Sequence, residues 1–381
     1  MNFDLEPKYK DIQTAALDLT RKIEPMAIEA DSLSVVHEGV LEALKESGLC
    51  RLMVPAQYGG TFDSINPLAI CVAREAMMAT SSHLDSLFAL QGIGSYAITV
   101  AGSDAQRSEW LPRIAKLEAL GALALTEEMA GSDLKAVSTE IQQTDNGLLL
   151  NGSKSYISNA GASSYFIVFA KENSGYSTVL VPADTVGVTT KPSPELIAPH
   201  VLGDVFFENV MLPESARLGR PGDGLQNALA TLGVFRVSVA GAAVGLAQAA
   251  LDEAVRHTST RIQFGRPLAK LGPVAQMLAD CWTEIEMARL ITYRAAVMAC
   301  EDPSASLNQS SMAKLAASEM ASRVVDRCVQ MMGRWGLESQ SKIERLYRQA
   351  RPMRIYEGSS EVLRLGIAKQ LIIEKQSTVN C

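Results

Sequence analysis

The sequence predicts an α+β multidomain fold in which a β-rich segment lies between two helical segments. Apolar residues recur every three or four positions in residues 1–120 and again in residues 229–381, as they do in amphipathic helices. Residues 121–228 instead contain short β-prone runs separated by Gly, Pro, Ser and Asn. A chain of 381 residues is long enough for two or three domains. We therefore expect three domains with boundaries near residues 120 and 228.

The first segment reads as a set of helices. Ile12, Ala16 and Leu19 follow the helical spacing, as do Val40 and Leu44 further along the chain. The turn signals Tyr58-Gly59-Gly60 and Asn66-Pro67 interrupt this pattern.

The middle segment contains the runs that we expect to form strands, and the last segment returns to helices. The β-prone runs are 122–126, 148–151, 165–170, 178–182 and 205–210. The later helical stretches are 239–255, 312–332 and 362–374, and the first of these is rich in Ala and Gly, which suits close helix packing.

Composition narrows the possible functions. The net charge of −7 favours neither nucleic acid nor an anionic membrane as a partner. No apolar run reaches the ~18 residues that a membrane span needs, and the first residues do not resemble a signal or transit peptide. We therefore expect a cytoplasmic protein. The six Cys residues form no Cys-x-x-Cys pair and only four His are present, so no metal site is expected.

The turn Tyr356-Glu357-Gly358-Ser359-Ser360 is the strongest candidate for a catalytic feature. Gly358 allows a sharp bend next to an acid, and a Ser can cap the helix that follows. A carboxylate mounted on such a corner can face a cavity and act as a general base. The residues alone also fit a simpler interpretation, in which Glu357 is an acid at a helix N-terminus.

Five motifs in this chain resemble those of the acyl-CoA dehydrogenase family, in the family's order. Residues 354–362 are similar to its C-terminal Tyr-Glu-Gly motif, and Thr126-Glu127 with Gly131-Ser132-Asp133 resembles its flavin-binding signature. The other three are Asn151 to Asn159, Arg261 to Pro267, and the stretch from Gln330-Met331-Met332-Gly333 to Arg345-Leu346-Tyr347-Arg348. The resemblance implies an N-terminal helical domain, a middle β-barrel or sandwich domain and a C-terminal four-helix-bundle domain.

The resemblance also implies a reaction. Glu357 would remove the α-proton of an acyl thioester, and N5 of FAD would take the β-hydride, which no side chain can accept. Arg236, Tyr356 and Gly358 would contact the substrate. Some family members carry the base beside the helical Arg, but here Phe235 precedes Arg236, which favours Glu357. The implied partners are an acyl thioester, an electron acceptor such as electron-transfer flavoprotein, and further copies of the chain in a homotetramer.

The residues that the resemblance assigns to FAD come from separate parts of the chain. Hydroxyl groups, backbone N–H groups and an Arg suit the ring and the pyrophosphate of a flavin nucleotide. They are Leu125, Thr126, Gly131, Ser132, Tyr156, Ser158, Arg261, Gln263, Phe264, Gln330, Gly333, Ser359 and Glu361.

The chain departs from the family pattern near the expected substrate mouth. Glu128 follows Glu127 where the family usually has Pro, Tyr156 replaces a usual Trp, and Arg334 follows Gly333 where a second Gly is common. Residues 198–202 replace a usual Arg-x-Ser-x-Thr loop. These changes leave open an alternative substrate, an acyl or aminoacyl unit on an acyl carrier protein. More distant alternatives are a flavin oxidase that uses O₂ and a non-catalytic flavin-binding protein.

Overall fold

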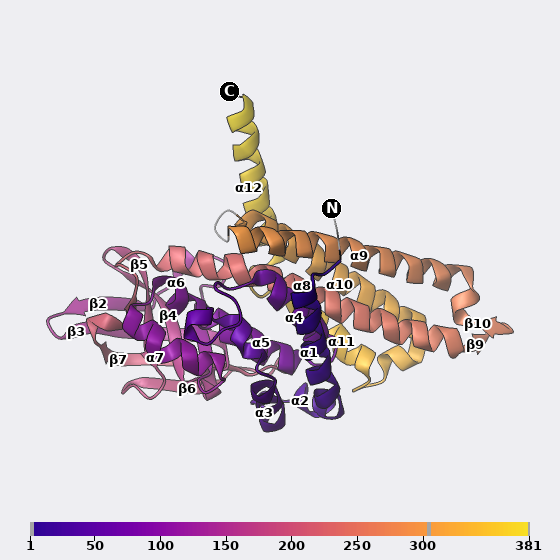
Figure 1. Ribbon diagram of the computed structural model, residues 1–381, viewed down its shortest axis with the longest axis horizontal. Helices are drawn as coiled ribbons and strands as arrows, with labels where there is room; N and C mark the ends of the chain where they lie inside the picture. The colour runs from indigo at the N-terminus through magenta and orange to yellow at the C-terminus, as the bar shows by residue number, and fades with distance from the viewer. Residues whose placement is uncertain (1–3, 303–305, 380–381) are drawn as a thin grey trace. The chain divides into compact units, whose positions relative to one another are not determined.

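The order of helices, strands and helices that the sequence predicts is confirmed in the computed structural model, which describes residues 4–302 and 306–379 (Figure 1). Strand β1 begins at Gly121, one residue after the first predicted boundary, and helix α8 begins at Gly224, slightly before the second. The helices before the sheet are α1 (Pro7–Ile23), α2 (Ala27–Ala30), α3 (Glu38–Ser47), α4 (Pro67–Met78), α5 (Ser82–Ile93), α6 (Tyr96–Ala101) and α7 (Asp104–Ala115).

The middle segment folds into one eight-stranded sheet. Its strands are β1 (Gly121–Ala124), β2 (Glu140–Thr144), β3 (Gly147–Ser158), β4 (Tyr165–Glu172), β5 (Gly175–Pro182), β6 (Val188–Pro192), β7 (Leu202–Leu212) and β8 (Arg217–Leu218). The order across the sheet is β6-β7-β3-β2-β4-β5-β8, with β1 paired in parallel to β4. The sequence missed β2, β6 and β8, because β2 and β6 are polar and β8 is very short.

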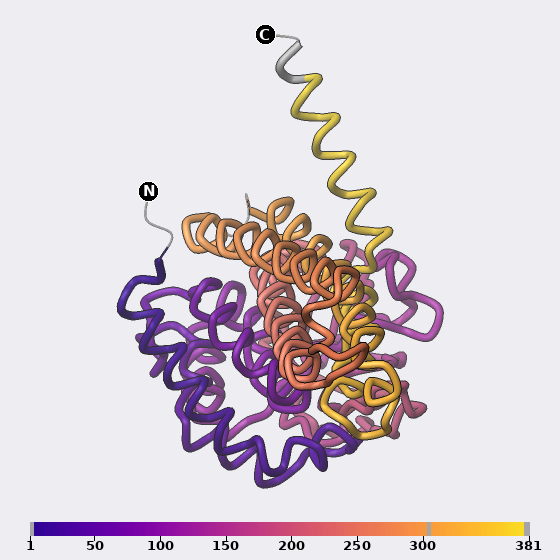
Figure 2. The backbone as a smooth tube through the Cα atoms, turned by 90° about the vertical axis from the view of Figure 1, so that its right-hand side faces the viewer, coloured from indigo at the N-terminus to yellow at the C-terminus, as the bar shows by residue number. Residues whose placement is uncertain are grey.

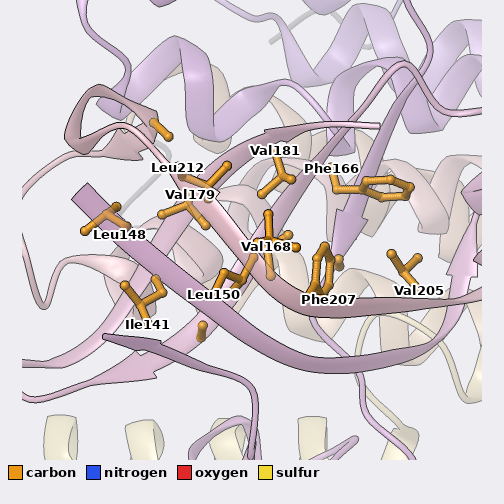
Figure 3. Packing of buried hydrophobic residues seen from close by; sticks show 14 of the residues in the cluster. Ile141, Leu148, Leu150, Phe166, Val168, Val179, Val181, Val205, Phe207 and Leu212 are labelled. Carbon is orange, nitrogen blue, oxygen red and sulfur yellow. The ribbon is translucent and has the colours of Figure 1, made fainter. Parts of the chain in front are cut away.

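The core of this sheet is built from alternate residues of its strands. Ile141, Leu150, Val168 and Phe207 are buried and belong to one cluster, and they come from β2, β3, β4 and β7 (Figure 3). The alternation of buried and exposed positions is clearest along β7, as expected for a strand with one face on the core.

The chain after the sheet is helical apart from a short hairpin, β9 (Ile262–Gln263) and β10 (Arg266–Pro267). Its helices are α8 (Gly224–Thr260), α9 (Gly272–Glu301), α10 (Leu307–Met332), α11 (Lys342–Ala350) and α12 (Ser360–Val379). Helix α12 projects away from α9 and α10 in both views (Figures 1 and 2).

The backbone groups into two compact units that do not follow the three segments. One contains Met1–Asp31, Pro67–Asp85 and Arg236–Cys381, and the other contains Ser32–Asn66 and Ser86–Phe235. Within the first unit α4 and α8 pack closely, because a Cβ on Gly245 would lie only 1.9 Å from the carbonyl oxygen of Glu75. The close packing expected of this Ala- and Gly-rich helix is confirmed. It brings N-terminal helices into the same compact unit as the C-terminal ones.

Helix α8 differs from one expectation. Within the described residues it is long and apolar enough to cross a membrane, whereas the sequence pattern suggested that no run would be. However, 83% of its most apolar window is buried inside the protein. It is therefore better explained as a core helix of the fold.

Candidate active site

The turn that carries Glu357 has an unusual backbone. It follows α11 and a short 3-10 helix (Pro352–Arg354), and it ends where α12 begins at Ser360. Glu357 has φ of +53° and Gly358 has φ of +101°. A non-glycine residue with positive φ costs of order 1–3 kcal/mol and persists only where its surroundings fix it. A Cβ on Gly358 would lie 3.2 Å from Nη2 of Arg236, so glycine also leaves room for that guanidinium.

Two buried cations hold this turn by its carbonyl groups. Arg236 of α8 donates from Nε to the backbone oxygen of Glu357 at 2.8 Å, and from Nη1 to Ser311 at 3.1 Å. Lys314 of α10 donates from Nζ to the backbone oxygen of Gly358 at 2.7 Å. Hydrogen bonds from charged donors are stronger than those between neutral groups. The conformation of the turn is therefore fixed from two different helices.

The Glu357 carboxyl group lies in an environment suited to a base. Its Oε2 atom is shielded from solvent and has no hydrogen-bond partner among the described residues. Burial raises the pKa of Glu357 above its ordinary value, although Arg74, Lys314 and Arg236 act against this shift. A carboxylate with a raised pKa is a stronger base than an exposed one.

The sequence did not identify the Arg74–Asp85 pair near this turn. Arg74 of α4 contacts Asp85 of α5 through Nε at 2.9 Å and Nη2 at 2.7 Å, and it donates to Ser238 at 2.8 Å. Both partners are buried, and Arg74 acts electrostatically on Glu357. The sequence signal was present, since Arg74 lies within the apolar stretch that forms α4.

The structure brings several predicted residues together at the turn. Tyr356 and Gly358 flank Glu357, and Arg236 reaches it from α8. Ser359 accepts from the backbone N–H of Val362 at 3.4 Å, at the start of α12. Glu361 is exposed, and its nearest cation is Arg364 at 3.8 Å.

A second group of predicted residues lies near the β9–β10 hairpin of the same unit. Phe264 has φ of +51° and is 87% exposed. The guanidinium of Arg261 lies 4.9 Å from the ring centre of Trp335, and that of Arg334 lies 4.2 Å from it. Trp335 thus brings the Arg261 segment next to the end of α10. The remaining predicted residues of this group, all exposed, are Gln263, Gln330 and Gly333.

In the other unit a buried ion pair organises the Thr126 loop. The Glu127 carboxylate accepts from Nζ of Lys154 at 2.9 Å and from the backbone N–H of Ser138 and Thr139 at 2.6 and 3.0 Å. Desolvation opposes its charge, but these hydrogen bonds outweigh it and lower the pKa of Glu127 to about 2. Burial lowers the pKa of Lys154 to about 8 despite the attraction of Glu127. Lys154 and the backbone of Ser138 and Thr139 therefore fix the position of the Thr126 loop.

The Thr126 loop leaves space and polar groups available to a ligand. Lys154 also donates to the backbone oxygen of Leu125 at 3.0 Å, and Ser155 donates to that of Thr126 at 2.9 Å. A Cβ on Gly131 would meet nothing within 4 Å, and Ser132 is exposed. In the part of the chain that the structure describes, the hydroxyl groups of Thr126 and Ser132 make no hydrogen bond.

Strand β3 places the last two predicted residues of this unit. Tyr156 has φ of +56° and is 50% exposed, and its backbone N–H donates to Asp204 at 3.2 Å. Ser158 lies 3.0 Å from Nε2 of His200, which also lies 3.3 Å from Ser86. His200 belongs to the loop that departs from the family pattern, so the departure reaches a residue predicted to contact FAD.

The residues present fit a flavin nucleotide. In one unit, the Thr126 and Ser132 hydroxyl groups, which have no partner in the described part of the chain, and the open backbone at Gly131 offer donors and space to a large polar ligand. In the other unit the guanidinium groups of Arg261 and Arg334 both lie against the ring of Trp335. Among the described residues, neither guanidinium has a carboxylate within 4.0 Å. Such groups suit a phosphate-bearing ligand.

Comparisons with known proteins identify close relatives. The chain matches the models of the acyl-CoA dehydrogenase N-terminal domain over residues 7–118, the middle domain over 122–210 and the C-terminal domain over 222–372. It is 35% identical to cyclohex-1-ene-1-carbonyl-CoA dehydrogenase of Geobacter metallireducens, over 93% of this chain and 94% of that protein.

Two solved structures share its fold. Butyryl-CoA dehydrogenase of Megasphaera elsdenii superposes with a TM-score of 0.93 at 30% identity, over 98% of this chain and 100% of that chain. A glutaryl-CoA dehydrogenase of Mycobacterium smegmatis in complex with FADH₂ superposes with a TM-score of 0.90 at 25% identity, over 96% and 95%.

Proposed function

Because the chain belongs to the acyl-CoA dehydrogenase family, we propose that it is an FAD-dependent enzyme that introduces a double bond between Cα and Cβ of an acyl-CoA thioester. The observation that supports this most strongly is the Glu357 turn. It combines a left-handed backbone, a raised pKa and a buried carboxylate oxygen that has no hydrogen-bond partner within residues 4–302 and 306–379. Perturbed carboxyl groups of this kind are typical of functional sites.

Glu357 acts as the base in this proposal. Its carboxylate takes the α-proton, which is weakly acidic, so the carboxylate must be ionised and poorly hydrated before the transfer. Burial supplies the poor hydration and raises the pKa of Glu357, and the cations Arg74, Lys314 and Arg236 oppose that shift and favour the charged form. Arg236 and Lys314 prevent the turn from relaxing, so the carboxylate keeps its direction. Contacts of Arg236, Tyr356 and Gly358 with the substrate remain predictions.

FAD, when bound, supplies the acceptor for the β-hydride. The residues that would hold it are the predicted set in each unit. In the sheet-containing unit these are Leu125, Thr126, Gly131, Ser132, Tyr156 and Ser158, and in the helical unit they are Arg261, Gln263, Phe264, Gln330, Gly333, Ser359 and Glu361. In this assignment Arg261 would bind the negatively charged phosphates of FAD.

The substrate is proposed to be an acyl-CoA. The relative and the two solved structures described above are all named as dehydrogenases of CoA thioesters, which favours CoA as the carrier of the acyl group. The alternative of an acyl carrier protein receives no support from these relatives. The oxidase and the non-catalytic alternatives are likewise unsupported, and the Glu357 turn is intact.

A direct test uses the colour of the flavin. The purified protein should be yellow, hold about one FAD per chain, and lose its flavin absorbance when a suitable acyl-CoA is added without oxygen. The measurement is an anaerobic titration with a panel of acyl-CoAs of different length and branching, with the same acyl groups on a carrier protein as the comparison. A colourless protein that does not bind added FAD would contradict the proposal. If only the carrier-protein substrates bleached the flavin, the carrier of the acyl group would be a protein and not CoA.

We further propose that the enzyme works as a homotetramer and passes electrons to an electron-transfer flavoprotein. Exposed apolar side chains support the assembly, since Leu365 on α12 is 73% exposed and Trp282 on α9 is 61% exposed. Contiguous apolar surface often marks a protein–protein interface. Light scattering should give the mass of four chains, and a monomer with full FAD content would contradict this.

A cytoplasmic location also remains a prediction.

A further inference from the structure

Lys314 is a buried ammonium group that contacts no counterion among the residues the structure describes. It lies on α10 and is 0% exposed. Its hydrogen bond to the backbone oxygen of Gly358 is 2.7 Å long. Among residues 4–302 and 306–379, no carboxylate lies within 4.0 Å of Nζ. Burying a cation in this way is costly, so the fold must gain something that offsets the cost.

Lys314 and Arg236 act on consecutive peptide groups. Arg236 binds the carbonyl of Glu357, and Lys314 binds the next carbonyl along the chain. The two residues come from α8 and α10, which also meet through the hydrogen bond between Arg236 and Ser311. The turn between them has two successive residues with positive φ. A strained turn needs such external contacts to keep one conformation.

We propose that Lys314 is a positioning residue for Glu357, which fixes the direction of its carboxylate through the Gly358 carbonyl and supplies a positive charge that acts on it. The inference rests on the proposed function, because it concerns the base of the proposed reaction. It adds a residue to which the sequence motifs assigned no role.

The charges around Glu357 determine the sign of the effect. Burial raises the pKa of Glu357, and Lys314 is one of the cations that lower it. Removing that cation therefore raises the pKa of Glu357 further, so the base becomes protonated at a higher pH than in the wild type. Burial also lowers the pKa of Lys314 itself to about 8, so its charge matters most below that pH. The other charged or titratable groups that act on this pair are Arg74, Asp85, Arg236, Glu319, Tyr356 and Glu361.

The test separates charge from hydrogen bonding with two variants. Lys314→Gln keeps a donor for the Gly358 carbonyl but removes the charge, whereas Lys314→Arg keeps both. The rate of flavin reduction is followed by stopped flow across pH, with FAD content matched and with whichever acyl-CoA of the panel bleaches the wild type fastest. The acid limb of the profile is the fall in rate at low pH that reports protonation of Glu357. For Lys314→Gln this limb should move to higher pH by about one unit, which lowers the rate at a given pH on the limb about tenfold. The rate should return towards wild type at alkaline pH, and Lys314→Arg should keep the wild-type limb.

A matched control is Arg345→Met. Arg345 is a buried cation of the same unit that contacts Asp31 at 2.6 Å and the backbone oxygen of Ala27 at 3.3 Å. Its loss should lower thermal stability without moving the acid limb. The inference is overturned if Lys314→Gln leaves the acid limb in place, or if its rate falls equally at every pH. If Lys314→Gln does not retain FAD, a shifted limb in Lys314→Arg would also overturn it, because that variant preserves the charge.

Failure of this inference can be told from failure of the proposed function. If Glu357→Gln still reduces its flavin, the base is elsewhere and the proposed mechanism fails with it. If Glu357→Gln is inactive while the acid limb of Lys314→Gln stays unmoved, only the role of Lys314 is wrong.

Discussion

Replacing Lys154 by Met should destabilise the sheet-containing unit by about 3–5 kcal/mol, because it leaves the buried Glu127 carboxylate without its cation. The two side chains are 0% and 6% exposed, and they are 2.9 Å apart. The ammonium also binds the backbone oxygen of Leu125, so the same change removes two contacts that hold the Thr126 loop. The midpoint and slope of urea unfolding, measured on the FAD-free protein, together give the loss of unfolding free energy.

The chain offers a matched control on the same sheet. Lys171 on β4 lies 3.7 Å from Glu140 on β2, and both side chains are at least 40% exposed. Exposed ion pairs are worth about 0–1 kcal/mol, so Lys171→Met should change the midpoint little. If Lys154→Met and Lys171→Met had similar effects, Glu127 and Lys154 would not anchor the loop. The double variant Glu127→Gln, Lys154→Met should recover part of the loss, since no charge then remains buried.

The parts of the fold with strong local patterns could be predicted from the sequence. Residues 239–255 read as a helix because small and apolar residues dominate a stretch that contains no Pro, and they lie inside α8. Residues 165–170 read as a strand because aromatic and β-branched residues dominate, and they lie inside β4. The family, suggested by five motifs in register, is confirmed by the matched domain models.

What the sequence missed has a common cause, which is that the stabilising partner lies far away along the chain. Strand β6 is polar and exposed, and only its pairing with β7 makes it a strand. Lys314 looks like one charge in a helical pattern, but its partner is the Gly358 carbonyl. Arg74 is separated from Ser238 in the same way. Local spacing shows which residues share a helix face, but it does not show what that face meets.

Glu357→Gln should keep the fold and the FAD content while nearly abolishing reduction of the flavin by substrate. Gln has almost the same size and can hydrogen-bond, but its amide cannot accept the α-proton. Loss of a general base typically lowers the rate about 10²- to 10⁴-fold, and a weak carbon acid should fall at the larger end. The carbonyl contacts with Arg236 and Lys314 involve only the backbone, so the turn should survive the change. Thermal unfolding and flavin absorbance of the variant provide the control for structure.

The most direct measurement is therefore anaerobic stopped-flow bleaching of the flavin by the best acyl-CoA, with wild type and Glu357→Gln compared at equal FAD content. Glu357 is proposed to take the α-proton, and hydride loss from Cβ depends on that step. The wild type should bleach rapidly, and the variant should retain its flavin absorbance over a period at least about 10² times longer. Bleaching of the variant within a few-fold of the wild-type rate would contradict the account and place the base elsewhere.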